Sequence, residues 1–264
     1  MKNRKLVYTI ITLVIAAVFY FYDGYAVETD VSNKTEKNLG FDFLPTSTTG
    51  QVVHHQFYAL SYHEKYEQAE WVAYELTQKQ LLSISIKRPY FEQDPKVTTQ
   101  SAHYKNYKDS GYNKGHLCPA GDRKFSVEAY NETFFTSNIS PQTYEFNGGV
   151  WNRLEEKVRY WAHKHQKLYV VTGGILTPNL KTIGTEKVAV PQYFYKIILD
   201  YNGAETKAIA FLIPHEKSEK GLYQFVTSID EIEDLTGIDF YPELPDDIEN
   251  ELEKSSDYKH WAFR

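Results

Sequence analysis

A polar segment at residues 110–123 (Ser-Gly-Tyr-Asn-Lys-Gly-His-Leu-Cys-Pro-Ala-Gly-Asp-Arg) contains the side chain best suited to acid–base chemistry. His116 lies in its middle, and an unperturbed imidazole titrates near neutral pH, so it can accept a proton from water. A single histidine after a glycine is more often structural. The prediction that His116 is a general base therefore depends on the motifs that accompany it.

Two further polar motifs follow, Ser-Asn-Ile-Ser-Pro-Gln at residues 137–142 and Phe-Asn-Gly-Gly-Val-Trp-Asn-Arg-Leu-Glu at residues 146–155. Glu155 lies eight residues after Asn147, just over two helical turns, so the two belong near one face of a helix. Plain alternatives exist for each residue. Asn147 could cap a helix, Glu155 could be an exposed carboxylate, and Arg159 could form an i,i+4 ion pair with Glu155.

Other catalytic signatures are absent from the sequence. It contains no Gly-x-Ser-x-Gly, no Gly-Lys-Ser/Thr phosphate loop and no dinucleotide-binding glycine fingerprint. His63 and His215 are each followed by glutamate, as at the start of a zinc-protease helix, but Glu67 and Glu219 stand where that motif needs a second histidine. We interpret both His-Glu pairs as solvated charge clusters.

The remaining candidate ligands also give no zinc site. His163 and His165 are two residues apart on a predicted helix and cannot share a face, so we expect both at the surface. Cys118 is the single cysteine. It excludes an internal disulfide and any zinc site with two or more thiolates, and we expect it to be a small buried residue.

The elements that must position these motifs can be predicted from apolar patterns. Strands are predicted at residues 71–76, 168–172, 193–199 and 208–213, with Asn202-Gly203 as a hairpin turn between the last two. A helix is predicted at residues 147–165, where apolar residues recur at three- and four-residue steps. A second helix is predicted at 225–237, beginning at Ser228. Strands and helices do not alternate strictly, which favours an α+β fold.

Charge is unevenly distributed, although the net charge is only −6. Residues 101–167 contain 10 Lys and Arg against 7 Asp and Glu, whereas residues 216–257 contain 14 Asp and Glu against 3 Lys. Because screening limits electrostatic reach to about 8 Å at physiological salt, an acidic C-terminal region is compatible with a basic site elsewhere. The net charge alone therefore does not exclude a nucleic-acid substrate.

The N-terminus has the features of an export signal or membrane anchor. Lys2, Arg4 and Lys5 precede an uncharged, mostly apolar run at residues 6–22. A helix of that length spans about 25 Å, slightly short of a bilayer core. Gly24-Tyr25-Ala26 fits a cleavage site. We predict a signal or transmembrane anchor at residues 1–26, a polar linker at 27–40 and one folded domain at 41–264, located outside the cytoplasm (periplasm-like or secreted).

Together the three polar motifs resemble those of the DNA/RNA non-specific endonuclease family, the endonuclease G-like branch of the ββα-metal (His-Me finger) nucleases. The family signature is Asp-Arg-Gly-His, then a Pro-Gln segment and an Asn-x-x-x-Trp helix. The corresponding residues here are 113–116, 141–142 and 147–151. The resemblance covers most of the chain, from residues 70–75 to 229–245. It implies an α+β fold with a central, mainly antiparallel sheet flanked by helices and a ββα-metal active-site motif.

The resemblance also implies an activity. The protein would be a metal-dependent hydrolase that cleaves phosphodiester bonds in DNA and RNA with little sequence preference and leaves 5′-phosphates. His116 would activate water, Asn147 would bind Mg²⁺ (with Mn²⁺ as the alternative ion), and Glu155 would hold a metal-bound water. Arg88 and Arg159 match phosphate-binding arginines. A neutral amide ligand suits Mg²⁺ and leaves its charge available to polarise the phosphate.

The sequence departs from the signature at Asn113-Lys114, where the family has Asp-Arg. Lys114 keeps the positive charge but lacks the bidentate fork of arginine, so we expect a lower catalytic efficiency rather than another reaction. Asn138 is expected to be a scaffold residue near the site, and its glycosylation motif a false positive, because a sugar there would block the site.

Two other functions remain open at this point. One is a nuclease-like domain that binds nucleic acid or protein without cleaving, and the other is a phosphodiesterase for another substrate. The expected partners are DNA and RNA, contacted through phosphates and therefore more weakly at high salt, and a membrane if the N-terminal segment is not cleaved. The oligomeric state is left open, a homodimer included.

Overall fold

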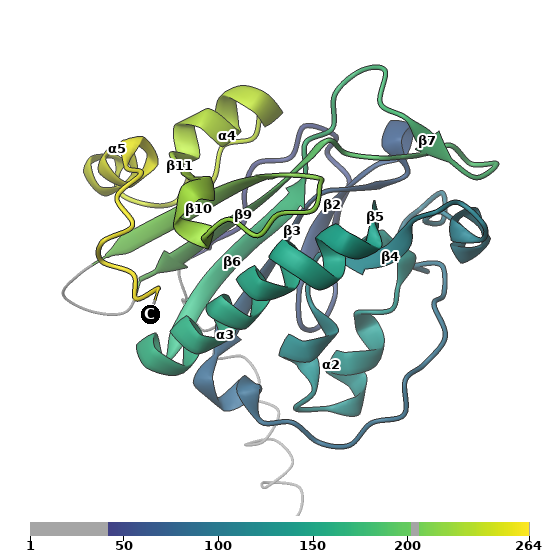
Figure 1. Ribbon diagram of the computed structural model, residues 1–264, viewed down its shortest axis with the longest axis horizontal. Coiled ribbons are helices and arrows are strands. Elements are labelled where there is room, and N and C mark those ends of the chain that lie inside the picture. Colours follow the sequence, from purple (N-terminus) through teal and green to yellow (C-terminus); the bar gives the residue numbers. More distant parts are fainter. Residues whose placement is uncertain (1–41, 202–205, 264) are drawn as a thin grey trace, which may run out of the picture. The chain divides into compact units, whose positions relative to one another are not determined.

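A seven-stranded antiparallel sheet forms the centre of the computed structural model, which describes residues 42–201 and 206–263 (Figure 1). Its strands lie in the order β1-β2-β3-β6-β9-β10-β11. Their bounds are Val52–His54 (β1), Ala59–His63 (β2), Gln68–Thr77 (β3), Lys167–Gly174 (β6), Tyr193–Asp200 (β9), Lys207–Pro214 (β10) and Val226–Thr227 (β11). The predicted α+β fold with a mainly antiparallel sheet is confirmed.

The four strands predicted from apolar runs are the four central strands, β3, β6, β9 and β10. Each extends one to three residues beyond its predicted ends, except that β9 begins at its predicted first residue, 193. These strands are covered on both faces, so their sequences are almost continuously apolar and easy to recognise. The edge strands β1 and β11 have three and two residues, too few for a pattern to develop. The predicted turn at Asn202-Gly203 lies outside the described residues.

One helix, α3 (Asn152–His165), covers one face of the sheet (Figure 1). Its apolar side chains pack against side chains from alternate positions of the central strands, including Val72, Val170, Ile198 and Phe211. Four residues of α3 are fully or almost fully buried there: Leu154, Val158, Trp161 and Ala162. Burial of side chains this large contributes about 1.5–3 kcal/mol for each aliphatic residue.

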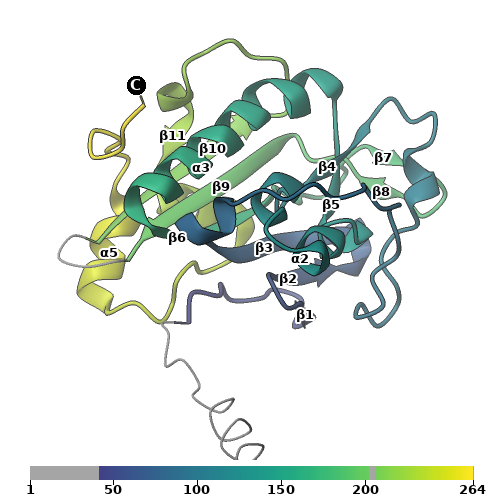
Figure 2. The ribbon, with the colours of Figure 1, turned by 90° about the horizontal axis from the view of Figure 1, so that it is seen from below.

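The opposite face is covered by the segment that begins with α4 (Ile229–Thr236) (Figure 2). Phe240 packs edge-on against Tyr195 of β9, with ring centroids 5.5 Å apart. The Tyr241 hydroxyl donates to the carbonyl oxygen of Tyr169 in β6. The predicted start of this helix is confirmed, because the Ser228 side chain accepts from the Glu231 amide at 3.1 Å.

A separate two-stranded ribbon carries the first polar motif. Strand β4 (Asn113–His116) pairs antiparallel with β5 (Ile139–Gln142), and His116 lies opposite Ile139. A side chain at Gly115 would place its Cβ 2.2 Å from Oε1 of Gln142. The glycine is therefore required by close packing across the ribbon. Both strands lie near the N-terminal end of α3 in the two views (Figures 1 and 2).

The helix predicted at residues 147–165 is regular only in its second part. Residues Phe146–Trp151 form a π-helical turn, η7, in which the Asn152 amide donates to the carbonyl oxygen of Asn147, and Gly149 departs from helical geometry. The α-helix begins at Asn152. The predicted Gly-Gly entry is thus a widened turn, because two successive glycines weaken the regular ladder.

The other described elements are short. The helices are α2 (Val127–Glu132) and α5 (Asp246–Lys254), and a small ribbon consists of β7 (Thr182–Ile183) and β8 (Val188–Ala189). The 3₁₀ turns are η2 (Glu64–Tyr66), η3 (Gln78–Leu81), η4 (Tyr104–Tyr107), η5 (Ala120–Arg123), η6 (Thr136–Asn138) and η8 (Leu222–Phe225). In the part of the chain that is described, no helix has the length and apolar character of a membrane span. The predicted segments 1–26 and 27–40 lie outside the described residues.

Candidate active site

His116 ends strand β4 with its ring packed against two phenylalanines. The ring centroids of Phe91 and Phe134 lie 5.7 and 5.1 Å from that of His116. Nε2 is buried and has no hydrogen-bond partner among the described residues. Burial, assisted by the positive charge of Arg88, lowers the pKa of His116 to about 3. The imidazole is therefore neutral at physiological pH.

Two cations of the predicted site, Arg88 and Lys114, lie against the same aromatic surface. The Arg88 guanidinium lies 5.6 Å from the ring centroid of Phe91 and 5.4 Å from that of Phe134. The Lys114 ammonium lies 5.3 Å from the Phe91 ring. Burial and the nearby Arg88 charge lower the pKa of Lys114. The structure therefore gathers Arg88, Lys114 and His116 around one ring.

Asn138 fixes the chain where it leaves this ribbon. Its side-chain Oδ1 accepts from the Cys118 amide at 2.8 Å, and its Nδ2 donates to the carbonyl oxygens of Cys118 and Thr133 at 3.0 Å. The side chain thereby continues the β4–β5 pairing beyond His116. Asn138 is fully buried, so the predicted scaffold role is confirmed and a glycan has no access. Cys118 is also buried, as predicted.

Asn147 lies inside the π-helical turn rather than at the cap of a helix. The N-cap position is occupied by Glu145, and no side chain caps this turn. The Asn147 side chain is half-buried, and its side-chain amide has no hydrogen bond to the described residues. The capping alternative is therefore not realised, and the amide oxygen is available to a ligand.

His215 fixes the segment that leads into this turn. Its Nε2 accepts from the Thr143 amide at 2.8 Å, and its Nδ1 donates to the Pro191 carbonyl at 2.8 Å. The Thr143 carbonyl in turn accepts from the Asn147 amide at 2.9 Å. The interpretation of His215 as part of a solvated charge cluster is wrong, because the fold packs its ring against both Phe146 and Phe194.

The two other histidine predictions had different outcomes. His163 is exposed, as expected, but His165 bonds through Nδ1 to the Asp200 carboxylate at 2.9 Å and is mostly buried. The prediction of a surface residue at His165 is therefore wrong, because the end of α3 packs on the end of β9. His63, in the other His-Glu pair, is partly buried against the Tyr66 ring.

Glu155 and Arg159 face η5 from successive turns of α3. Arg159 does not pair with Glu155, as one alternative had it, but bonds to Asp122 at 2.8 Å. Asp122 is buried and also accepts from the Tyr74 hydroxyl at 3.2 Å. Glu155 is partly buried, so the alternative of an ordinary exposed carboxylate is also not realised. Burial raises the pKa of Glu155, with Lys196 and Arg159 opposing the rise and Asp122 adding to it.

Comparison with known proteins gives the same assignment. The sequence profile of the DNA/RNA non-specific endonucleases matches residues 39–247. The mitochondrial nuclease EXOG of Danio rerio is 34% identical over 251 residues, which are 88% of this chain and 71% of that protein. The mitochondrial endonuclease G of Homo sapiens is 29% identical, over 74% of this chain and 70% of that protein.

This chain belongs to the DNA/RNA non-specific endonuclease family.

A solved structure of this family agrees with the fold. The crystal structure of the complex of EndoG with EndoGI, described as showing the mechanism of EndoG inhibition, matches with a TM-score of 0.69 at 27% identity. The match covers 74% of this chain and 87% of that one. The chain spans only 63%, 60% and 56% of EXOG from Xenopus laevis, Mus musculus and Homo sapiens. The predictions of the family, its fold and a hydrolase with endonuclease activity are confirmed.

For this member of the endonuclease family, sequence reasoning missed four residues that organise the site. Phe91 and Phe134 pack against the cations and the imidazole. Asp122 forms an ion pair with Arg159, and His215 bonds to the segment that precedes Asn147. Two of them had a signal, since Phe91 lies three residues after Arg88 and Asp122 lies in the first polar motif, six residues after His116. Phe134 and His215 come from segments outside the quoted motifs.

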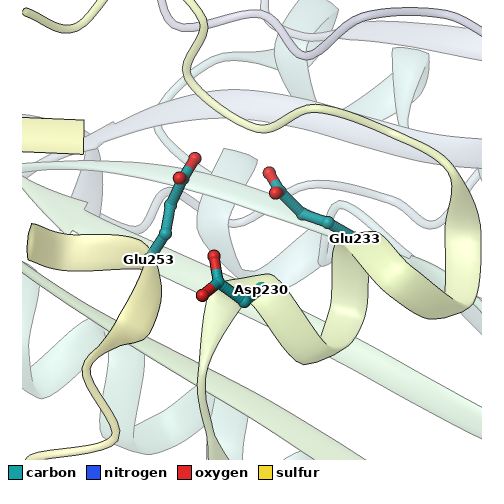
Figure 3. A group of neighbouring side chains, drawn as sticks. All are labelled: Asp230, Glu233 and Glu253. Carbon is teal, nitrogen blue, oxygen red and sulfur yellow. The ribbon is translucent and has the colours of Figure 1, made fainter. Parts of the chain in front are cut away.

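A second group of acidic side chains lies between α4 and α5. Asp230 and Glu233 of α4 and Glu253 of α5 point toward one another (Figure 3), with carboxylate oxygens within 4.8 Å. Burial and the neighbouring carboxylates raise the pKa of Glu253 to about 7. None of these residues belongs to the family motifs in residues 113–155.

Proposed function

We propose that this family member is a Mg²⁺-dependent endonuclease in which His116 activates the attacking water. The observation that carries the proposal is the gathering of Arg88, Lys114 and a neutral His116 around the Phe91 ring. Two cations beside a proton acceptor are what hydrolysis of a phosphodiester requires, because the phosphate must be bound where water is activated.

The chemistry at the phosphate follows from these positions. Arg88 and Lys114 bind the non-bridging oxygens and offset their negative charge. His116 takes a proton from the attacking water, whose oxygen forms a bond to phosphorus. The bond from phosphorus to the 3′ oxygen breaks, so the phosphate stays on the 5′ end of the downstream product. Since the contacts involve phosphates rather than base edges, cleavage is expected to have little sequence preference.

The residues at the start of α3 fit a magnesium ion. Asn147, in the turn before α3, offers a neutral side-chain amide oxygen that is not engaged within the described structure, and Glu155 lies on α3 with its side chain partly buried. Mg²⁺ takes few protein ligands and keeps several waters, so one amide oxygen and one carboxylate that binds an ion-bound water suffice. When bound, the ion would neutralise the phosphate and stabilise the departing 3′ oxygen.

Cleavage of supercoiled plasmid by the purified full chain tests the proposal. We expect nicking that requires Mg²⁺ and stops with EDTA. His116→Ala should lower the rate by about 10²–10⁴-fold, the usual contribution of a general base. His163→Ala, which removes an exposed histidine from α3, is the matched control and should cleave like wild type. Products should be resistant to 5′ labelling until treated with phosphatase.

Other outcomes would favour the two remaining functions. Binding of plasmid without cleavage by a folded, Mg²⁺-loaded wild type would indicate a nuclease-like binding domain, and Asn113-Lys114 would be the first residues to revert to Asp-Arg. Turnover of a small phosphodiester but not of plasmid or RNA would indicate another substrate.

We further propose that residues 1–26 direct the domain out of the cytoplasm, as a cleaved signal or as an anchor. The basic residues before the apolar run support this orientation. Mass spectrometry of the mature protein distinguishes the cases, since cleavage after Ala26 removes the anchor. An intact N-terminus on protein recovered in the cytoplasm would contradict the proposal.

A further inference from the structure

A fully buried lysine lies beneath the start of the catalytic helix. Lys196 occupies the middle of β9, paired with Thr172 of β6 and Phe211 of β10. Its side chain points to the face that α3 covers, because its neighbours at alternate positions, Phe194 and Ile198, belong to the core under α3. Its Nζ is buried and has no hydrogen-bond partner among the described residues. An ammonium in such a place is costly unless nearby charge compensates it.

The Lys196 ammonium contacts the residue one helical turn before Glu155. Nζ of Lys196 lies 4.8 Å from the ring centroid of Trp151. Glu155 follows Trp151 by one helical turn, and side chains at i and i+4 are neighbours on a helix surface. Arg159 follows by one further turn. Trp151, Glu155 and Arg159 therefore form a row along α3, with Lys196 below its first member.

Several ionisable groups surround Lys196 near this row. The ionisable groups that act on Lys196 are Glu155 and Arg159 on α3, Asp122 on η5, and Cys118 between β4 and η5. Arg159 is already bonded to Asp122 at 2.8 Å. Among the described residues Glu155 has no ion pair, and of the two cations that act on it Lys196 has a larger effect than Arg159. Burial lowers the pKa of Lys196, and Glu155 and Asp122 act against this.

We propose that Lys196 is a positioning residue, whose ammonium balances the Glu155 carboxylate from inside the core and keeps it turned toward the Asn147 side of α3. The role rests on the proposed function of Glu155. It adds a residue that lies 41 positions away in the sequence and does not touch the substrate. A lysine that only fills space under Trp151 would have no energetic coupling to Glu155.

A double-mutant cycle on cleavage tests the coupling. We expect Lys196→Met to lower kcat by about 10- to 100-fold while changing KM less than about threefold, because the substrate contacts are intact. In a Glu155→Gln background, Lys196→Met should cause little further loss. Equal losses from Lys196→Met in both backgrounds would overturn the proposal.

Urea unfolding of the metal-free proteins gives a second measurement that does not depend on activity. Lys196→Met alone leaves Glu155 without its cation, so the urea midpoint should fall. Adding Glu155→Gln removes the uncompensated charge and should raise the midpoint again, even where the single variant folds poorly. A double variant no more stable than Lys196→Met would contradict the proposal.

Lys207→Met is the matched control. Lys207 is a partly buried lysine on the adjacent strand β10, and it lies 3.9 Å from Asp200 at the far end of the sheet. The control should leave kcat unchanged and show no coupling to Glu155→Gln. The two proposals fail in different ways, since a folded wild type that does not cleave contradicts the proposed function. Cleavage by wild type with additive losses contradicts only the role of Lys196.

Discussion

The carboxylates at the site and those between α4 and α5 show how differently one kind of side chain can be used. The site carboxylates are Glu155 and Asp122, and the α4–α5 carboxylates are Asp230, Glu233 and Glu253. Burial raises the pKa of both Glu155 and Glu253. At the site, Arg159 and Lys196 oppose this rise. Between α4 and α5 the charges that act on Glu253 are Glu233, Glu249, Asp230 and Asp239, all carboxylates.

The difference separates two origins of a perturbed carboxylate. A raised pKa in a cluster is often used as a mark of a functional site, but here the mark is present in both places. What distinguishes the site is a pair of cations beside the carboxylates. These are Arg159 of α3, which bonds to Asp122 of η5, and Lys196 of β9. The α4–α5 carboxylates repel one another near solvent, and Glu233 has a structural task, accepting from the Phe240 amide at 2.8 Å.

The largest expected effect compares the same substitution in the two groups. Glu155→Gln should lower the rate of plasmid cleavage by on the order of 10²-fold or more, because an amide cannot accept a proton or bind ion-bound water as a carboxylate does. Glu253→Gln should cleave like wild type. Similar losses from both variants would remove the functional distinction between the two groups.

Neutralising one aspartate in each group tests the compensation by cations. Asp122→Asn leaves Arg159 without its buried partner and should lower the free energy of unfolding by about 3 kcal/mol, measured in urea. Asp230→Asn should change it by less than about 0.5 kcal/mol, because relief of repulsion offsets the lost attraction to the N-terminus of α4. A stabilising Asp122→Asn would mean that Asp122 is also uncompensated.

The start of α3, which carries Glu155, also differs from that of α5, which carries Glu253. The turn before α3 is fixed by His215, whereas α5 begins at Asp246, and Pro245 before it gives no side-chain cap. His215→Phe should lower cleavage by about tenfold and weaken Mg²⁺ binding measured by calorimetry, because the Thr143 amide loses its acceptor and the Asn147 turn is less well fixed. Pro245→Ala is the control, and we expect its cleavage rate to match wild type.

The smallest effect is a pH-dependent stabilisation in the α4–α5 group. The pKa of Glu253 is raised to about 7 in the folded protein and is about 4.3 in an unfolded chain. Wild type therefore gains stability as pH falls from above 7 toward 4.5. Glu253→Gln lacks this term, so it should be more stable than wild type above about pH 7 and equal to it below about pH 4.5. Because water screens this partly exposed group, we expect the two proteins to differ in stability by less than about 1 kcal/mol. The difference should be visible as a slightly higher Tm of Glu253→Gln at pH 8.

Sequence reasoning located the motif residues but could not describe their neighbours. His116, Asn147 and Glu155 were found because each lies in a short motif whose order is specific. Phe134 contacts His116 without belonging to such a pattern, and the pairing of Asp122 with Arg159 joins two motifs whose contact no local pattern predicts. His215 was misinterpreted because a histidine beside a glutamate looks solvated, whereas the fold partly buries it against two phenylalanine rings.

The central strands and the amphipathic helix were determined by the sequence alone, since hydrophobic periodicity follows directly from the order of residues. So was the family, through three ordered motifs. The tertiary structure decided which charges meet. Arg159 pairs with Asp122 rather than with Glu155, and Lys196 comes under Trp151, because α3 packs across η5 and β9. Such contacts join residues tens of positions apart, and their energies depend on distance and burial, which local patterns do not contain.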